Sequence, residues 1–113
     1  MHEMSLAEGI VQILESEAQK QQFTRVKEVC LEVGDLAGVE LDALEFSFDV
    51  VTRQTLAEGC SLAIESVPGS AYCFDCAVEV PLARRGQPCP KCAGYSLQVV
   101  GGTQMRVKSL EVE

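Results

Sequence analysis

Residues 73–92 read CFDCAVEVPLARRGQPCPKC, a pair of Cys-x-x-Cys motifs separated by twelve residues. Each motif can present two thiolates from one tight turn, and two such turns together form a tetrahedral site of four sulfur atoms. Pro90 and Gly94 suit the tight turn that the second motif requires. The spacing therefore predicts a metal site, with zinc as the first candidate and iron in a rubredoxin-like centre as the second. Its ligands are Cys73, Cys76, Cys89 and Cys92.

The predicted site is structural, because a closed site of four cysteines leaves no open position for a substrate. The segment 71–102 holds these four cysteines and three of the four prolines of the chain. So short a segment cannot bury an adequate hydrophobic core by itself, and a bound metal supplies the missing cross-link. We expect 71–102 to form a zinc-binding domain, and 1–70 plus 103–113 to form a separate α+β domain.

Two other roles for the cysteines stay open. Either motif could serve thiol redox chemistry of the thioredoxin kind, although two matched pairs at this spacing favour metal binding. A ribbon that binds nucleic acid would have little support beyond Arg84 and Arg85 between the motifs. The remaining cysteines, Cys30 and Cys60, lie in strand patterns and are interpreted as small apolar residues without chemistry.

Length and charge exclude several classes of protein. The 113 residues suffice for one domain, or for one domain and a small module. The 17 acidic and 9 basic residues give a net charge of −8, which opposes binding to nucleic acid or to an anionic membrane. The start lacks the features of a signal peptide, and no stretch approaches the roughly 18 apolar residues of a membrane span. We expect a cytoplasmic protein.

The apolar pattern predicts an α+β fold. Ser5 and Glu8 fit a capping box before apolar residues at helical spacing, and period-two alternation marks the strands. We expect two helices packed on one face of a small three-stranded sheet, built from the first, second and last strands, with an inserted four-cysteine zinc-ribbon module. The predicted helices are 5–21 and 40–53, and the predicted strands are 25–33, 60–65 and 104–112.

His2, the only histidine, is the second candidate site. The Met1 amine, the His2 amide nitrogen and the His2 imidazole can chelate a square-planar metal such as Ni(II) or Cu(II), with Glu3 as a further donor. Because Ser5 is predicted to cap the first helix, the residues before it should lie outside the helix and be free to bind. Metal must displace protons from these groups, so the affinity should fall in acid. Such an exposed, labile site suits delivery better than catalysis.

Two alternative functions compete with metal delivery through His2. Most residues at position two have no special role, so His2 could be incidental in a zinc-stapled adaptor for protein–protein interaction. Catalysis is not expected, because no nucleophile and base pair is visible and an imidazole near a terminus is poorly positioned for proton transfer.

The chain resembles the HypA family of hydrogenase nickel-incorporation proteins, also called HybF, over essentially its whole length. The resemblance is carried by Met1-His2-Glu3, by the two cysteine motifs and by VKSLEVE at residues 107–113. It extends to Phe46-Ser47-Phe48 and to LAEGC at residues 56–60.

The resemblance implies a nickel metallochaperone for maturation of [NiFe] hydrogenase. Ni(II) would be a transient cargo of His2, with the Met1 amine and Glu3 as possible further ligands, and Zn(II) would be held structurally by the four cysteines. A HypB-type GTPase and the large-subunit precursor of a [NiFe] hydrogenase are the implied partners, and in some relatives the nickel reaches urease. Glu40 would correspond to an acidic residue that assists nickel binding in the family.

Overall fold

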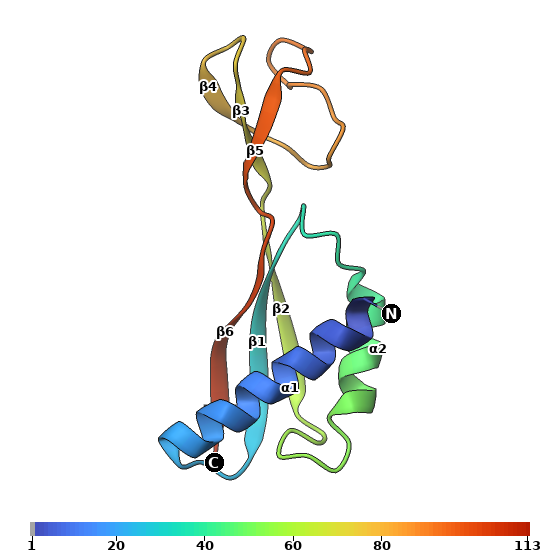
Figure 1. Ribbon diagram of the computed structural model, residues 1–113, viewed down its shortest axis with the longest axis vertical. Coiled ribbons are helices and arrows are strands. Elements are labelled where there is room, and N and C mark those ends of the chain that lie inside the picture. The colour runs from blue at the N-terminus through green and yellow to red at the C-terminus, as the bar shows by residue number, and fades with distance from the viewer. Residues whose placement is uncertain (1) are drawn as a thin grey trace. The chain divides into compact units, whose positions relative to one another are not determined.

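The computed structural model describes residues 2–113, in which two helices and six strands form (Figure 1). The strands make two sheets, in the orders β2-β1-β6 and β4-β3-β5. The predicted α+β fold is confirmed, because the first, second and last predicted strands share one sheet and the four-cysteine segment is an insertion. The elements are α1 (His2–Gln21), β1 (Val26–Gly34), α2 (Leu41–Val51), β2 (Ser61–Val67), β3 (Ser70–Cys73), β4 (Val78–Pro81), β5 (Leu97–Gly101) and β6 (Met105–Val112).

The chain divides into two compact units. Unit 1 holds the described residues up to Leu31, together with Val39–Ile64 and Val107–Glu113. Unit 2 consists of Glu32–Gly38 and Glu65–Arg106. Unit 1 therefore contains both helices, and unit 2 contains the whole of the β4-β3-β5 sheet.

Unit 1 is held together by one apolar stripe on each helix and by the strands. Residues three and four apart on a helix share a face, and on α1 this places four apolar side chains in the core. The two helices pack against each other, with Leu44 and Phe48 of α2 buried at 0% and 3% exposure. The remaining core side chains of this unit are Ala7, Ile10, Val11, Leu14, Val26, Val29, Cys30, Leu31 and Ala57.

The start of α1 corrects one prediction. The helix begins at His2, so Ser5 lies inside it and the predicted capping box with Glu8 is wrong. The carboxylate of Glu3 accepts a hydrogen bond from the distant Glu40 amide, and a carboxylate in the first turn also suits the helix dipole. This tertiary contact stabilises a helical first turn that local sequence patterns do not reveal.

Unit 2 contains a sheet that the sequence analysis did not predict. Strand β3 pairs antiparallel with both β4 and β5, and Cys73 lies opposite Val78 on one side and Leu97 on the other. Ala71 and Val80 occupy the buried face of this sheet. The alternation Val78-Glu79-Val80 is a strand signal, but the cysteines and prolines around it obscured the pattern.

Two glycines of unit 2 share a left-handed backbone but differ in their surroundings. Gly102 has φ +76, and a Cβ atom there would lie 2.6 Å from the Gly69 Cα and 2.7 Å from the Pro68 carbonyl oxygen. Gly86 has φ +83, and a Cβ atom there would meet nothing within 4 Å. The backbone around Gly102 is therefore packed too closely for any side chain.

We expect Gly102→Ala to destabilise the protein far more than Gly86→Ala. The left-handed backbone costs alanine about 1 kcal/mol at either site, whereas the backbone clash at residue 102 should raise the loss to about 3 kcal/mol or more. Urea unfolding of both variants measures the difference. Equal losses would show that the close approach at Gly102 is not a constraint.

Candidate metal centres

The four predicted sulfur ligands converge in unit 2. The Sγ atoms of Cys73 and Cys92 lie 3.7 Å apart, and those of Cys76 and Cys89 lie 4.0 Å apart. All four sulfur atoms lie within 4.8 Å of one another. A zinc ion with four sulfur ligands at the usual bond length places the sulfurs about 3.8 Å apart. The cluster therefore has the size of a tetrahedral site for one ion.

Both cysteine motifs adopt the same turn. The amide of Ala77 donates to the carbonyl of Cys73, and the amide of Ala93 donates to the carbonyl of Cys89, each at 2.8 Å. Ala77 and Ala93 have φ values of 57 and 62, which is the left-handed region. Backbone amides also point at sulfur, since the Lys91 amide lies 3.4 Å from the Cys89 Sγ. The pairs are thus equivalent knuckles, each closed by a strained alanine.

The thiols of the cluster differ in acidity. Burial alone raises the pKa of Cys89, but hydrogen bonds from the Cys92 and Lys91 amides to its sulfur outweigh burial and lower that pKa to about 7. Hydrogen bonding to the Cys92 thiol raises the pKa of Cys76 to about 12. One thiol therefore ionises readily near neutral pH, while others keep their protons until a metal displaces them.

We expect Ala77→Gly to stabilise unit 2 by about 0.5 to 1 kcal/mol. A left-handed backbone costs an L residue about 1 to 2 kcal/mol, and glycine relieves this at a smaller cost in chain entropy. The matched control is Ala83→Gly at an exposed position that lacks a positive φ, where glycine should be neutral or destabilising. Thermal unfolding of the zinc-loaded protein tests the pair, and a loss of stability in Ala77→Gly contradicts the strain at this knuckle.

Zinc binding at pH 7 should release about three to four protons per ion, because most of these thiols are protonated there. Affinity should then fall steeply as the pH is lowered. Calorimetry in buffers of different ionisation enthalpy counts the protons. Cys76→Ser should lose tight binding, whereas Cys60→Ser, which changes a cysteine outside the cluster, should keep one ion per chain. Release of fewer than one proton is incompatible with four thiolate ligands.

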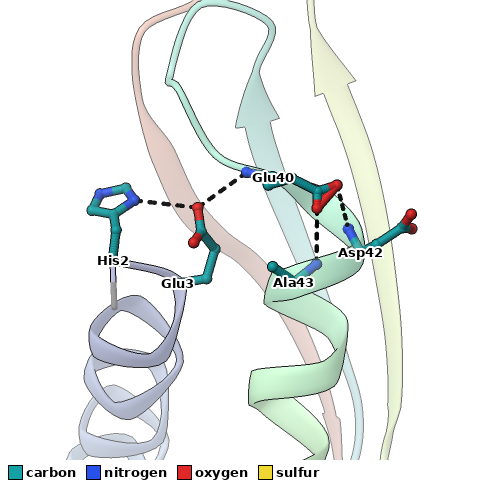
Figure 2. A network of polar contacts seen from close by, with 5 residues as sticks. All are labelled: His2, Glu3, Glu40, Asp42 and Ala43. Atoms are coloured by element: carbon teal, nitrogen blue, oxygen red, sulfur yellow. Dashed lines mark hydrogen bonds and ion pairs between the residues drawn. The ribbon is translucent and has the colours of Figure 1, made fainter.

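The second candidate site lies at the start of α1 in unit 1. The His2 Nδ1 atom lies 3.4 Å from the Glu3 Oε2 atom, and the amide of Glu40 donates to the same oxygen at 3.2 Å. Figure 2 shows the His2 ring and the Glu40 amide approaching this one carboxylate from different sides. The His2 side chain is 60% exposed, whereas that of Glu3 is only 17% exposed. Glu3 is therefore held in place, while His2 stays open to solvent.

The contact with Glu40 also sets the charge of Glu3. The Glu40 amide that donates to the carboxylate is the main reason why the pKa of Glu3 lies below its ordinary value, and the neighbouring His2 lowers it further. Glu3 is thus ionised at neutral pH, and this contact is lost only as the pH falls through the lowered pKa. An ionised carboxylate beside an exposed imidazole offers an oxygen and a nitrogen donor together.

Glu40 itself caps α2. Its two carboxylate oxygens accept hydrogen bonds from the Asp42 amide at 3.2 Å and the Ala43 amide at 3.1 Å. In Figure 2 this carboxylate turns toward its own helix, and only the backbone of Glu40 faces Glu3. The sequence did not predict this capping role, because glutamate is not among the usual N-cap residues. The position just before the apolar residues of the second helix was the available signal.

The structure thus brings together some of the predicted ligands and not others. Within residues 2–113, the four cysteines are the one group of three or more histidine, cysteine or acidic side chains with converging donor atoms. His2 and Glu3 form a pair, and the predicted Met1 amine ligand lies outside the described residues. Cys30 and Cys60 lie outside the cluster, as expected. None of the described helices is long and apolar enough to cross a membrane.

Comparison with known proteins gives a consistent result. The family described as hydrogenase/urease nickel incorporation, metallochaperone, hypA, matches residues 1–112. The hydrogenase maturation factor HypA of Alkalilimnicola ehrlichii is 58% identical over 113 residues, and that of Albidiferax ferrireducens is 55% identical over 113 residues. In both cases the match covers 100% of each chain.

Two solved structures share the fold. The solution structure of the Ni metallochaperone HypA from Helicobacter pylori matches with a TM-score of 0.69 and 21% identity, over 97% of this chain and 96% of that chain. A solution structure of HypA protein matches with a TM-score of 0.68 and 24% identity, over 100% of this chain and 97% of that chain. At these identities the structures support the fold alone.

The fold and the cysteine cluster together define the class of protein. It is a small α+β protein with an inserted segment whose four cysteines could hold a metal ion. The chain belongs to the HypA family. It is therefore a metallochaperone of nickel incorporation in hydrogenase maturation, and this family consists of maturation factors rather than enzymes. The resemblance found in the sequence is confirmed over the whole chain.

Proposed function

We propose that the chain carries Ni(II) at its amino terminus and delivers it to a [NiFe] hydrogenase under assembly. The observation that carries this proposal is the convergence of His2 and Glu3. The Nδ1 atom of His2 lies 3.4 Å from a Glu3 carboxylate oxygen that the Glu40 amide fixes in place. Nitrogen and oxygen donors of this kind suit divalent nickel.

The helical start of α1 supports the chelate in one respect. The first four amides of a helix have no acceptor within it, so the His2 amide nitrogen is available as a ligand. A chelate that includes this nitrogen uses the Nδ1 atom of the same residue, and Nδ1 is the ring atom that faces Glu3. The Met1 amine would complete three nitrogen donors, with Glu3 as the fourth ligand.

The same location makes the proposed site labile. The start of a helix carries a partial positive charge, which opposes a bound cation, and the Glu3 carboxylate offsets it. His2 is 60% exposed, so a partner can reach the metal. Both features favour transfer over storage.

Zinc is the proposed resident metal of the cysteine cluster. Four sulfur donors satisfy a tetrahedral ion and leave no position for a substrate, so zinc would order the two knuckles rather than react. Iron fits the same sulfur geometry, and the absorption bands of an iron–thiolate centre would identify it. In this division of roles, 71–102 is the zinc-binding domain, and 1–70 plus 103–113 is the nickel-binding domain.

The proposed partners are the proteins that nickel delivery requires. A HypB-type GTPase and the large-subunit precursor of a [NiFe] hydrogenase are the proteins with which the chain would cooperate, in the cytoplasm. The family description also includes urease, so urease is a second possible client. The competing function is a zinc-stapled adaptor that joins the same proteins without carrying nickel.

Nickel titration of the zinc-loaded protein with its native terminus separates these functions. We expect one labile Ni(II) per chain, with binding lost in His2→Ala and weakened when residues are added before Met1. Affinity should fall as the pH is lowered, because protons compete with the metal for the nitrogen donors. Calorimetry and the d–d absorption bands of square-planar nickel are the measurements.

Lys20→Ala is a suitable control, because Lys20 lies in the last turn of α1 and is exposed. Nickel binding should be unchanged in this variant. If His2→Ala and the extended terminus bind nickel as the unaltered chain does, the adaptor function is the better account.

A further inference from the structure

Unit 1 contains a pocket between α2 and the start of β2, on elements seen in green in Figure 1. Its volume is about 270 Å³. Pockets for small-molecule ligands usually span about 300 to 1,000 Å³, so this pocket is matched in size to one long side chain rather than to a cofactor. Its walls include Glu45, Phe48, Asp49 and Thr52 on one side and Cys60 and Leu62 on the other.

The pocket has two carboxylates that are incompletely paired. Glu45 and Asp49 are four residues apart on α2, where like charges repel by a few tenths of a kcal/mol. Asp49 accepts from Arg53 at 3.3 Å, in an exposed pair of the kind that contributes little to stability. The Glu45 carboxylate makes no ion pair or hydrogen bond among residues 2–113. A cation placed between the two carboxylates would relieve their repulsion.

The rest of the lining includes apolar side chains and one hydroxyl that is already hydrogen-bonded. Phe48 is only 3% exposed, and Leu62 is partly buried. The hydroxyl of Thr52 donates to the Phe48 carbonyl at 2.8 Å, so it does not compete for a ligand. The lining is more polar than apolar, so the pocket suits a cationic head group, with only part of an apolar stem in contact.

We propose that this pocket is a docking site for an arginine side chain of a partner protein. A guanidinium group presents several donors in one plane and can bridge two carboxylates, which a lysine ammonium does less well. Charge favours a basic partner surface, because unit 1 carries twelve acidic and five basic side chains. A second copy of the chain, with the same net charge of −8, is disfavoured by repulsion.

This docking site would serve the proposed function, and it rests on that function in one respect. The partner is taken to be a protein that takes part in metal delivery. The pocket lies on the helix whose cap residue, Glu40, also donates to Glu3. Arginine binding itself does not require nickel. Loss of nickel binding in His2→Ala and loss of docking in a pocket variant are therefore separate results.

The test is a titration of the ¹⁵N-labelled, zinc-loaded chain with N-acetyl-argininamide, followed by amide chemical shifts. We expect saturable shifts at residues 45–62, and weaker binding of free L-arginine, whose own carboxylate is repelled. The neutral isostere N-acetyl-citrullinamide should not bind. Glu45→Gln should weaken binding by about three- to tenfold. Glu15→Gln removes the same charge from an exposed position of α1 and should alter affinity by less than about twofold.

Several outcomes would overturn the proposal. Equal shifts with the citrulline probe, or equal weakening in Glu15→Gln, would indicate no site or a diffuse charge effect. Tighter binding of free arginine would indicate a small-molecule site, and tighter binding of N-acetyl-lysinamide would exclude arginine as the preferred side chain. Shifts of the pocket amides on concentrating the chain alone would identify a second copy as the occupant.

Discussion

The hydrogen bond between the Glu40 amide and the Glu3 carboxylate is the contact on which the amino-terminal half of unit 1 depends. It links residues 37 positions apart and joins the first turn of α1 to the residue that caps α2. It also lowers the pKa of Glu3 and holds that carboxylate beside the His2 ring. This polar contact therefore joins the starts of α1 and α2 and places the His2 ring nitrogen and the Glu3 carboxylate together at the proposed nickel site.

The two candidate metal centres differ in the softness of their donors. The cysteine cluster offers four sulfur atoms at the spacing of a tetrahedral ion, whereas the amino terminus offers nitrogen and carboxylate oxygen. Thiolates select soft or borderline ions in tetrahedral geometry, and deprotonated nitrogen donors favour square-planar nickel. His2 is the only histidine in the chain, and the cysteine cluster includes sulfur donors alone. The proposed nickel site combines nitrogen and oxygen donors instead.

Sequence patterns predicted what depends on local spacing. The cysteine motifs predicted the convergence of four sulfur atoms, because two turns of fixed length leave few alternatives, and period-two alternation predicted the strands of the first sheet. The start of α1 was missed because a contact with Glu40 outweighs the capping signal at Ser5. The sequence patterns also did not predict that Glu40 caps α2, or that a sheet forms around Cys73. An unusual capping residue and strands of only four or five residues give weak signals in a sequence.

Glu3 can serve the fold and a metal together because a carboxylate has two oxygens. The Oε2 atom accepts from the Glu40 amide, and an ionised carboxylate keeps lone pairs on Oε1 for a further partner. A metal bound through Oε1 would leave the cap of α2 intact, and with it the pocket farther along that helix. Loading with nickel and docking of a basic partner would then be independent events at the two ends of α2. On this argument, the partner distinguishes loaded from empty chains by contact with the metal itself, and not by a change in α2.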